Sequence, residues 1–134
     1  MAERGDDSGR PILSRAEIDA DVCDLTTIGR VSGQDRTVEL WFAASGATVY
    51  FLSGGGEHAH WVRNLAADAT ATITINGKAF AGTARTVTDP DEDAQARRLL
   101  AAKYQGWREG RPLSRWARES LVVGVDVEAA PQVR

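Results

Sequence analysis

Hydrophobic and polar positions alternate along much of the chain, which is the pattern of half-buried β-strands. From residue 21 onward, runs rich in β-branched and aromatic residues predict six strands, at 24–28, 37–43, 48–52, 71–75, 78–87 and 121–127. Turn signals separate several of these runs, and Asn76-Gly77 is the dipeptide most typical of a two-residue hairpin. The strands are therefore expected to pair mainly as antiparallel hairpins, among them 37–43 with 48–52.

Two segments have the spacing of helices instead. Trp61 and Leu65 fall on one face of a short helix predicted over 58–67. A second helix is predicted from Thr88 or Asp89 to about residue 103 or 104, because either residue can cap it, proline suits its first turn and acidic residues follow. The segment 105–118 has a mixed pattern that glycine and proline interrupt.

Together these elements predict a fold that is mainly β with helices, a six-stranded and mostly antiparallel barrel whose ends the helices plug. A small antiparallel sheet that buries one face tends to close in this way, because closure removes its unpaired edges. Residues 1–15 are polar and contain several glycines, and they are expected to form a flexible N-terminal arm. Residues 16–134 are expected to form a single domain, which suits a chain of 134 residues.

Composition and charge narrow the range of functions. Sixteen Lys and Arg against nineteen Asp and Glu give a net charge of −3, which argues against a protein that binds a nucleic-acid backbone. The only cysteine is Cys23 and the only histidines are His58 and His60, so neither an internal disulfide nor a metal cluster is expected. The sequence shows no apolar run long enough for a membrane span and no secretory signal, which predicts a cytoplasmic protein.

The turn between the first two predicted strands is the most informative segment. Gly29 and Gly33 allow the backbone to bend so that amide N–H groups can converge on an anion. Arg30 and Arg36 can add bidentate hydrogen bonds to a phosphate or carboxylate, and Ser32 adds a hydroxyl. By its spacing alone the segment fits a solvated surface loop at least as well, and it lacks the Gly-Lys-Ser/Thr of a nucleotide-binding loop.

Two further features could carry chemistry. The run Ser53-Gly54-Gly55-Gly56 would let a flat ligand approach the backbone, although a plain turn into the helix fits it too. Tyr104 and Trp107 follow the long helix, where they are placed to cover the mouth of a pocket. No serine, histidine and acid are arranged as a catalytic triad. An anion-binding loop without acid–base groups favours a protein that orients a cofactor, which then does the chemistry.

The segment from Leu25 to Arg36, LTTIGRVSGQDR, resembles the LTTxGRxSGxxR signature of the deazaflavin-dependent nitroreductase family. The resemblance continues through Leu40-Trp41-Phe42, residues 50–56 and residues 61–65. It implies an FMN-binding type of split β-barrel, related to pyridoxamine phosphate oxidase, that binds the deazaflavin coenzyme F420 or, in some relatives, FMN. It also implies an oxidoreductase that passes hydride from the reduced coenzyme to an electron-poor small molecule, such as a quinone or nitroaromatic. Related split barrels are commonly homodimers.

The same resemblance assigns roles to individual residues. The coenzyme's phosphate and tail would be held by Arg30, Ser32, Gly33, Gln34 and Arg36. The deazaflavin ring would lie along Ser53, Gly54 and Gly55, with Trp61 beside the substrate pocket and Asn64 on the matching helix. Tyr104 falls near a tyrosine that lines the ring site and is the candidate proton donor.

The sequence departs from the family at two cationic positions. Val31 and Gly54 stand where relatives often have lysine, and each lost charged contact should weaken binding of a polyanionic tail by about 1.5–3 kcal/mol. Arg63 or Arg85 could compensate. FMN, which has a single short phosphate, is therefore an alternative cofactor. A split barrel that binds a flavin, deazaflavin or tetrapyrrole without turnover, or a structural dimer module without ligand, is an alternative function.

Overall fold

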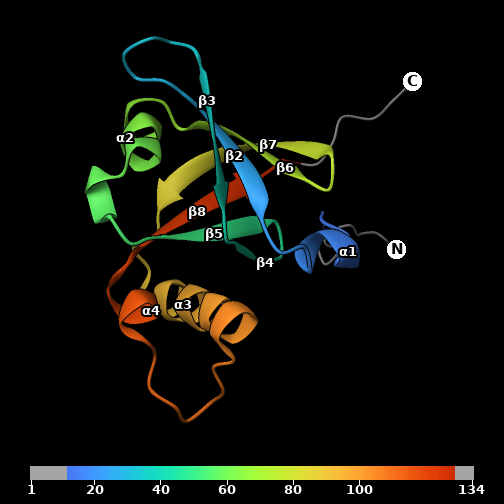
Figure 1. Cartoon of the computed structure of the whole chain (residues 1–134), viewed down its shortest axis with the longest axis vertical. Coiled ribbons are helices and arrows are strands. Elements are labelled where there is room, and N and C mark those ends of the chain that lie inside the picture. The colour runs from blue at the N-terminus through green and yellow to red at the C-terminus, as the bar shows by residue number, and fades with distance from the viewer. Residues whose placement is uncertain (1–11, 129–134) are drawn as a thin grey trace, which may run out of the picture.

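The computed structural model describes residues 12–128, which form one antiparallel sheet curled around an interior (Figure 1). In chain order its strands are β2 (Cys23–Ile28), β3 (Asp35–Leu40), β4 (Ala43–Ser45), β5 (Thr48–Ser53), β6 (Thr70–Ile75), β7 (Lys78–Thr86) and β8 (Leu121–Val127). Their order across the sheet is β3-β2-β6-β7-β8-β5-β4. The predicted fold class, a mainly antiparallel split barrel with helices, is confirmed, with seven strands rather than six.

The seventh strand exists because the run expected at 37–43 is not one strand. β3 ends at Leu40 and pairs with β2, whereas β4 begins at Ala43 and pairs with β5. These two strands are the opposite edges of the sheet, yet only Trp41 and Phe42 separate them along the chain. Three peptide units span at most roughly 11 Å. The two edges therefore have to approach each other here, and the sheet curls into a barrel.

The helices occupy the ends and one outer face of this barrel. They are α1 (Arg15–Ile18), α2 (His60–Ala67), α3 (Pro90–Gln105) and α4 (Arg115–Glu119), and a 3-10 turn, η1 (Gly56–His58), precedes α2. α3 begins as predicted, because the Asp89 side chain accepts a hydrogen bond from the backbone N–H of Glu92 and Pro90 is the first helical residue. α4 was hidden in the mixed segment of the sequence, and Ser114 caps it.

Part of the predicted N-terminal arm lies outside the described residues, namely 1–11. The rest of it is tied to the domain. Leu13 is 1% exposed in the barrel core, and Ser14 forms a reciprocal capping box with Glu17 at the start of α1.

Strand alternation divides the apolar side chains of β5 and β8 between two clusters. One face of each strand points into the barrel, with Val49, Phe51, Val123 and Val125. The other face lies beneath α3 and α4, with Tyr50, Leu52 and Val122. These strands are buried on both sides, which explains their nearly continuous hydrophobic sequences. Helix α2 adds Trp61, Val62 and Leu65 to the barrel cluster.

The end of α3 fixes the link that closes the barrel. The Tyr104 hydroxyl accepts a hydrogen bond from the N–H of Phe42 (3.1 Å) and donates to the carbonyl of Asp21 (2.8 Å). The Tyr104 ring stacks on Trp41 with 4.4 Å between ring centres. The ammonium group of Lys103 lies 3.8 Å from the centre of the Phe42 ring and donates to the Phe42 carbonyl (3.0 Å). Closure of the barrel therefore depends on α3 as well as on the strands.

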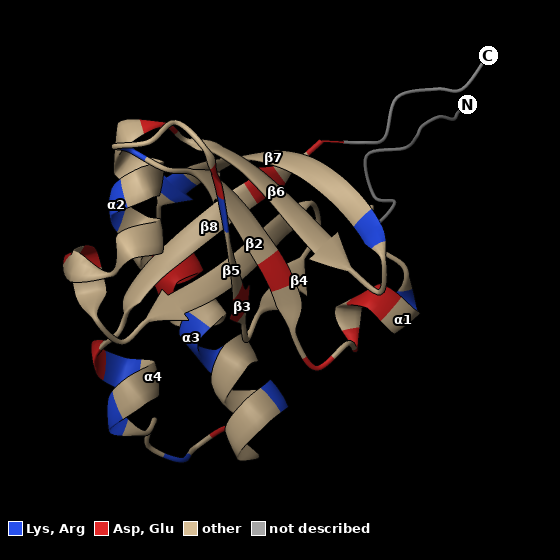
Figure 2. Cartoon of the chain, turned by 45° about the horizontal axis from the view of Figure 1, so that its top comes forward, with Lys and Arg blue, Asp and Glu red and all other residues tan. Residues whose placement is uncertain are grey.

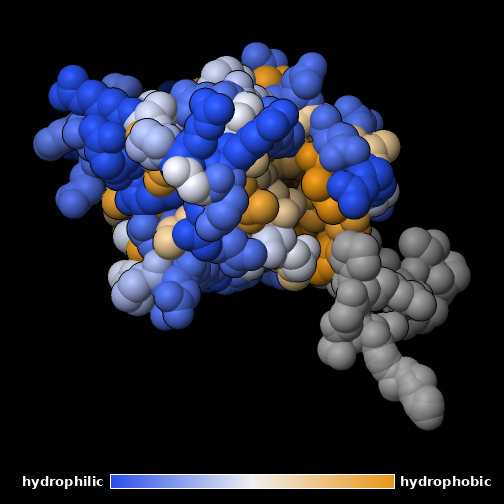
Figure 3. All heavy atoms as spheres, turned by 90° about the horizontal axis from the view of Figure 1, so that it is seen from below, coloured by the Kyte–Doolittle hydropathy of each residue, from blue (hydrophilic) through white to orange (hydrophobic). Residues whose placement is uncertain are grey.

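Basic residues concentrate on α3, α4 and the loop between them (Figure 2). Several are paired locally: Arg97 bonds Asp93 at 2.6 Å and Arg115 bonds Glu119 at 2.9 Å, both across one helical turn. Such pairs stabilise a helix by only a few tenths of a kcal/mol each. Viewed from below, the molecule has a hydrophilic surface around a hollow with hydrophobic walls (Figure 3).

One ion-pair network joins the barrel to the start of α3. Arg85 on β7 donates to both carboxylate oxygens of Glu92 (2.9 and 2.7 Å) and to Asp126 on β8 (2.7 Å). The buried Tyr50 donates to the same Glu92 at 2.5 Å. Hydrogen bonds from Arg85 and then Tyr50 lower the pKa of Glu92 to about 2. Burial and the Glu92 contact raise the pKa of Tyr50 to about 12.

This network predicts pH-dependent stability. We expect Glu92→Gln to lower the free energy of unfolding by about 1–2 kcal/mol at pH 7. A carboxylate whose pKa falls on folding stabilises the protein above its unfolded pKa and loses that effect as the pH falls, here from about 4.5 toward about 2. Urea denaturation of the wild-type protein and the variant at pH 7 and at pH 3 measures the difference in free energy of unfolding at each pH.

The matched control is Glu119→Gln, which removes the exposed ion pairs of Glu119 with Arg115 and Arg118 on α4 and should change stability by less than about 0.5 kcal/mol. A Glu92→Gln deficit of the same size at pH 7 and pH 3 would contradict the role given to its charge.

Candidate functional site

The loop between β2 and β3 is a closed turn whose shape requires glycine at two positions. The N–H of Gly29 donates to the carbonyl of Gln34 (2.8 Å), and the N–H of Gly33 donates to the carbonyl of Gly29 (2.8 Å). A Cβ at Gly29 would lie 2.8 Å from the Ser32 hydroxyl oxygen, and Gly33 has a φ of +74°. Arg30 lies within this turn, and Arg36 follows the turn as the second residue of β3.

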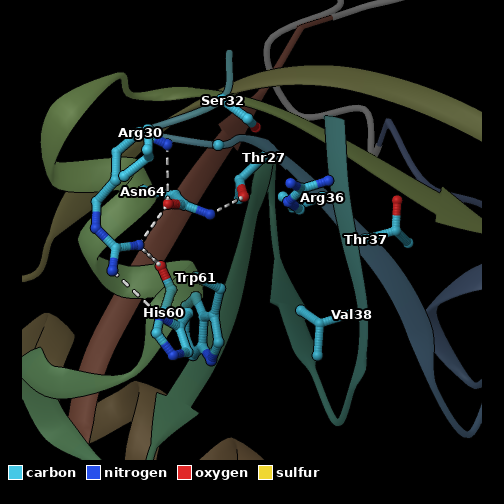
Figure 4. Close-up of a pocket in the computed structure, with 11 residues that line it drawn as sticks. Thr27, Arg30, Ser32, Arg36, Thr37, Val38, His60, Trp61 and Asn64 are labelled. Carbon is cyan, nitrogen blue, oxygen red and sulfur yellow. Dashed lines mark hydrogen bonds between the residues drawn. The ribbon is translucent and has the colours of Figure 1, made fainter. Parts of the chain in front are cut away.

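Arg30 is anchored to α2 through a buried asparagine (Figure 4). Asn64 is 4% exposed, and its side-chain oxygen accepts from the backbone N–H of Arg30 (3.2 Å) and from the guanidinium Nη1 (2.7 Å). The Asn64 amide donates to the hydroxyl of Thr27 on β2 (3.1 Å). One side chain therefore satisfies donors and acceptors on the loop and the strand, which joins the β2–β3 hairpin to α2.

Arg36 is oriented differently from Arg30. It pairs with Thr27 across the β2–β3 ladder, so both side chains lie on the face of the hairpin that turns toward α2. Figure 4 shows its guanidinium apart from the Arg30–Asn64 contacts. Among residues 12–128 no carboxylate or carbonyl is bonded to it. Arg36 is therefore free to bind an anion.

A cavity of about 720 Å³ lies between the hairpin and α2. Val38 and Trp61 supply apolar walls, and polar groups come from both sides; the lining residues are Thr27, Gly29, Arg30, Val31, Ser32, Arg36, Thr37, Val38, His60, Trp61 and Asn64. Two arginines and no carboxylate are among them. The first turn of α2 also faces the cavity, because His60 and Trp61 are among the lining residues. The cavity suits a flat ligand that carries negative charge.

The structure brings together only part of the predicted site. Of the predicted residues, Arg30, Ser32, Arg36, Trp61 and Asn64 line the cavity. Gly33 and Gln34 shape the loop but do not line it. Ser53, Gly54 and Gly55 lie apart, at the end of β5 ahead of η1, and the Ser53 hydroxyl donates to the carbonyl of Gly56 (2.9 Å).

Tyr104, the candidate proton donor, does not line this cavity. It lies at the far end of α3 against Trp41 and Phe42, where burial raises the pKa of its hydroxyl. The sequence motif could not distinguish a tyrosine that faces a ligand from one that holds a backbone link, because both follow the same helix.

Sequence reasoning missed His60 as a member of the site. The pattern was tested only for a metal site and a catalytic triad, whereas His60 lines the cavity and contacts Arg30. A signal was present: His60 and Asn64 are four residues apart on the predicted helix and therefore share one face. Thr37 and Val38, which also line the cavity, were read only as part of a strand.

Other reactive groups do not form a second centre in the part of the chain that the structure describes. Residues 12–128 contain no group of three or more His, Cys, Asp or Glu placed to hold a metal. Burial raises the pKa of the Cys23 thiol to about 12, which leaves it unreactive. No helix within the same range is both long and apolar enough to cross a membrane.

The Asn64 contacts make a prediction about stability. Asn64→Ala should leave the buried Thr27 hydroxyl and the part-buried donors of Arg30 without their partner, and lower the free energy of unfolding by about 1–3 kcal/mol. The Arg30 amide should also exchange its hydrogen faster. Asn64→Asp keeps an oxygen toward Arg30 and is the matched control, with most of the stability retained. Equal losses in the two variants, measured by urea denaturation, would argue against this role.

Comparison with solved structures finds the same fold in proteins of different function. An F420-H2-dependent reductase is 23% identical with a TM-score of 0.58, covering 78% of this chain and 93% of that one. A protein described as a domain-swapped dimer is 24% identical with a TM-score of 0.59, covering 87% and 84%. The heme storage protein of Vibrio cholerae is 14% identical with a TM-score of 0.65, covering 86% and 87%. These similarities establish the fold alone.

The family is identified by the sequence. No curated protein matches the chain. The model of the F420H(2)-dependent quinone reductase family matches residues 7–126, a range that includes the loop between β2 and β3, both edge strands of the sheet and helix α2. The chain belongs to the F420H(2)-dependent quinone reductase family.

Proposed function

We propose that this protein is a reductase that uses reduced coenzyme F420 to reduce an electron-poor small molecule, a quinone or a nitroaromatic. The observation that carries the proposal is the cavity between the β2–β3 hairpin and α2, where a free arginine, a fixed arginine and an indole meet without any carboxylate. Membership of the F420H(2)-dependent quinone reductase family supports the choice of coenzyme.

The lining residues fit a deazaflavin. The cavity volume of about 720 Å³ lies within the range of small-molecule sites, roughly 300–1,000 Å³. Trp61 and Val38 offer apolar surface to a flat ring, whereas the hydroxyls of Thr27 and Ser32 suit its polar edge. A phosphate-bearing tail requires cations, and Arg36 supplies one that no described residue neutralises.

When bound, the reduced coenzyme would supply the hydride. The chain's own residues would bind the coenzyme and orient it. Arg36 attracts the anionic tail, and Arg30 is held rigidly by Asn64 so that little side-chain entropy is lost on binding. The apolar walls exclude water from the ring. Among residues 12–128 no carboxylate lines the cavity, so negative charge that develops on a substrate during reduction meets positive or neutral groups of this range.

The two arginines that could replace the missing lysines differ in their ion pairs. Arg85 is held by Glu92 and Asp126, so its charge is already neutralised. Arg63 and Arg85 both line a second cavity of about 520 Å³ beside α2, which Arg30 and Glu57 line as well. We therefore propose Arg63 as the residue that compensates in part for Val31, which is 94% exposed at the loop tip, and Gly54.

We expect the enzyme to act as a cytoplasmic homodimer. The domain-swapped dimer found among proteins of this fold supports the dimer. In a second copy the exposed edge of β3 and the 46% exposed Trp41 would be the first surfaces to test.

Binding distinguishes the proposed coenzyme from FMN. Trp61 lines the cavity, so tryptophan fluorescence should be quenched when coenzyme F420 is titrated into the protein, and FMN should bind more weakly. Arg36→Ala removes a charge-assisted contact of about 1.5–3 kcal/mol and should raise the Kd for F420 roughly 10- to 100-fold. Arg115→Ala, on an arginine of α4 whose side chain is 84% exposed, is the control and should leave the Kd unchanged.

Preference for FMN would contradict the choice of coenzyme. Tight binding of F420 without oxidation of its reduced form by any quinone or nitroaromatic would support a binding protein in place of a reductase. An unchanged Kd in Arg36→Ala would overturn the role given to this residue.

A further inference from the structure

The contact between Arg30 and His60 determines where the histidine carries its proton. The guanidinium Nη2 lies 3.1 Å from Nδ1 of His60, and Nη1 donates to the His60 carbonyl (3.4 Å). An arginine side chain has only donors, so Nδ1 has to accept and must carry a lone pair. In the neutral imidazole the proton is then on Nε2.

Arg30 holds the His60 ring in this orientation, and Asn64 in turn holds Arg30. His60 is the first residue of α2, and its neighbour four positions on, Asn64, holds the same guanidinium through Nη1 (2.7 Å). Arg30 therefore bridges the side chains of one helix face. Figure 4 shows the His60 ring beside Trp61, beneath the Arg30–Asn64 contacts. The ring cannot turn over without breaking the bond to Arg30.

The remaining nitrogen of His60 is available to a ligand. His60 lines the cavity, and within residues 12–128 no group is bonded to its Nε2. The charged groups that line the cavity with it are Arg30 and Arg36. No carboxylate is among them to compete for the Nε2 proton. A neutral N–H donor beside Arg30, in a cavity that Arg36 also lines, is a group that stabilises an oxyanion.

We propose that His60 is a catalytic residue of this reductase, and that its Nε2–H donates a hydrogen bond to the substrate oxygen on which negative charge develops. The inference rests on the proposed function. The substrate gains two electrons and one proton as hydride, and its quinone or nitro oxygen becomes anionic. Nε2–H stabilises this oxygen, which then takes its proton from water, so His60 ends the step unchanged. Arg30 is the positioning residue that selects the tautomer.

The tautomer can be measured without any coenzyme. In the 15N-labelled protein at pH 8, the ring nitrogens of the two histidines give separate signals, and His58 serves as the internal reference. We expect the Nδ1 signal of His60 at the limit for an unprotonated nitrogen. Arg30→Gln should move it toward the averaged value of an exposed histidine. A proton on Nδ1 of His60, or a signal that Arg30→Gln leaves unchanged, would overturn the proposal.

Kinetics tests the catalytic part. His60→Phe removes the donor and should lower kcat with a quinone roughly 10- to 100-fold, a larger factor than its change in the Kd for F420. Loss of one preorganised donor to an oxyanion costs up to about 10²–10³ in enclosed sites, and this cavity is more open. His60→Gln, which retains an N–H donor, should recover part of the rate. His58→Phe is the matched control and should not change it.

Two outcomes separate this inference from the proposed function. If the wild-type protein oxidises reduced F420 with a quinone and His60→Phe keeps its kcat within about twofold, the role of His60 is overturned and the proposed function stands. If the wild-type protein binds no F420, the proposed function fails and the catalytic role of His60 fails with it.

Discussion

The constraint on which the structure depends is the shortness of the link between the two edges of its sheet. β3 and β4 are the outermost strands, and only Trp41 and Phe42 join them. The sheet has to curl until its edges approach, so the apolar faces of the strands meet in one interior. Because β3 pairs with β2 alone, the wall beside it stays open, and the cavity forms where α2 faces this opening.

Much of this fold could be predicted from the sequence, because local patterns decide it. The Asn76-Gly77 turn has the positive φ angles that its dipeptide suggests, and Asp89 and Pro90 start α3 as their side chains require. The break at Trp41 could not be found in this way. Residues 37–43 contain no turn signal, and the change of partner from β2 to β5 is a long-range event. α4 was likewise hidden, because Pro112 and the glycines around it suggest a loop.

The candidate site could likewise be predicted from the sequence only in part. The sequence could predict five cavity residues because one hairpin and one helix carry them all and the family motif spans both: Arg30, Ser32, Arg36, Trp61 and Asn64. Their roles could not be read from the motif: Arg30 and Arg36 have the same chemistry, but Asn64 holds one and leaves the other free. The importance of His60 depends on the direction of the Arg30 side chain, which no sequence pattern specifies.

The central claim is that the cavity between the β2–β3 hairpin and α2 holds coenzyme F420. The most direct test is to record backbone amide 15N and 1H chemical shifts of the protein with and without F420. The account predicts the largest changes in residues 29–38 and 60–64, with little change in α3 and α4. Changes confined to Ser53–Gly55, or to the surroundings of Tyr104, would contradict it.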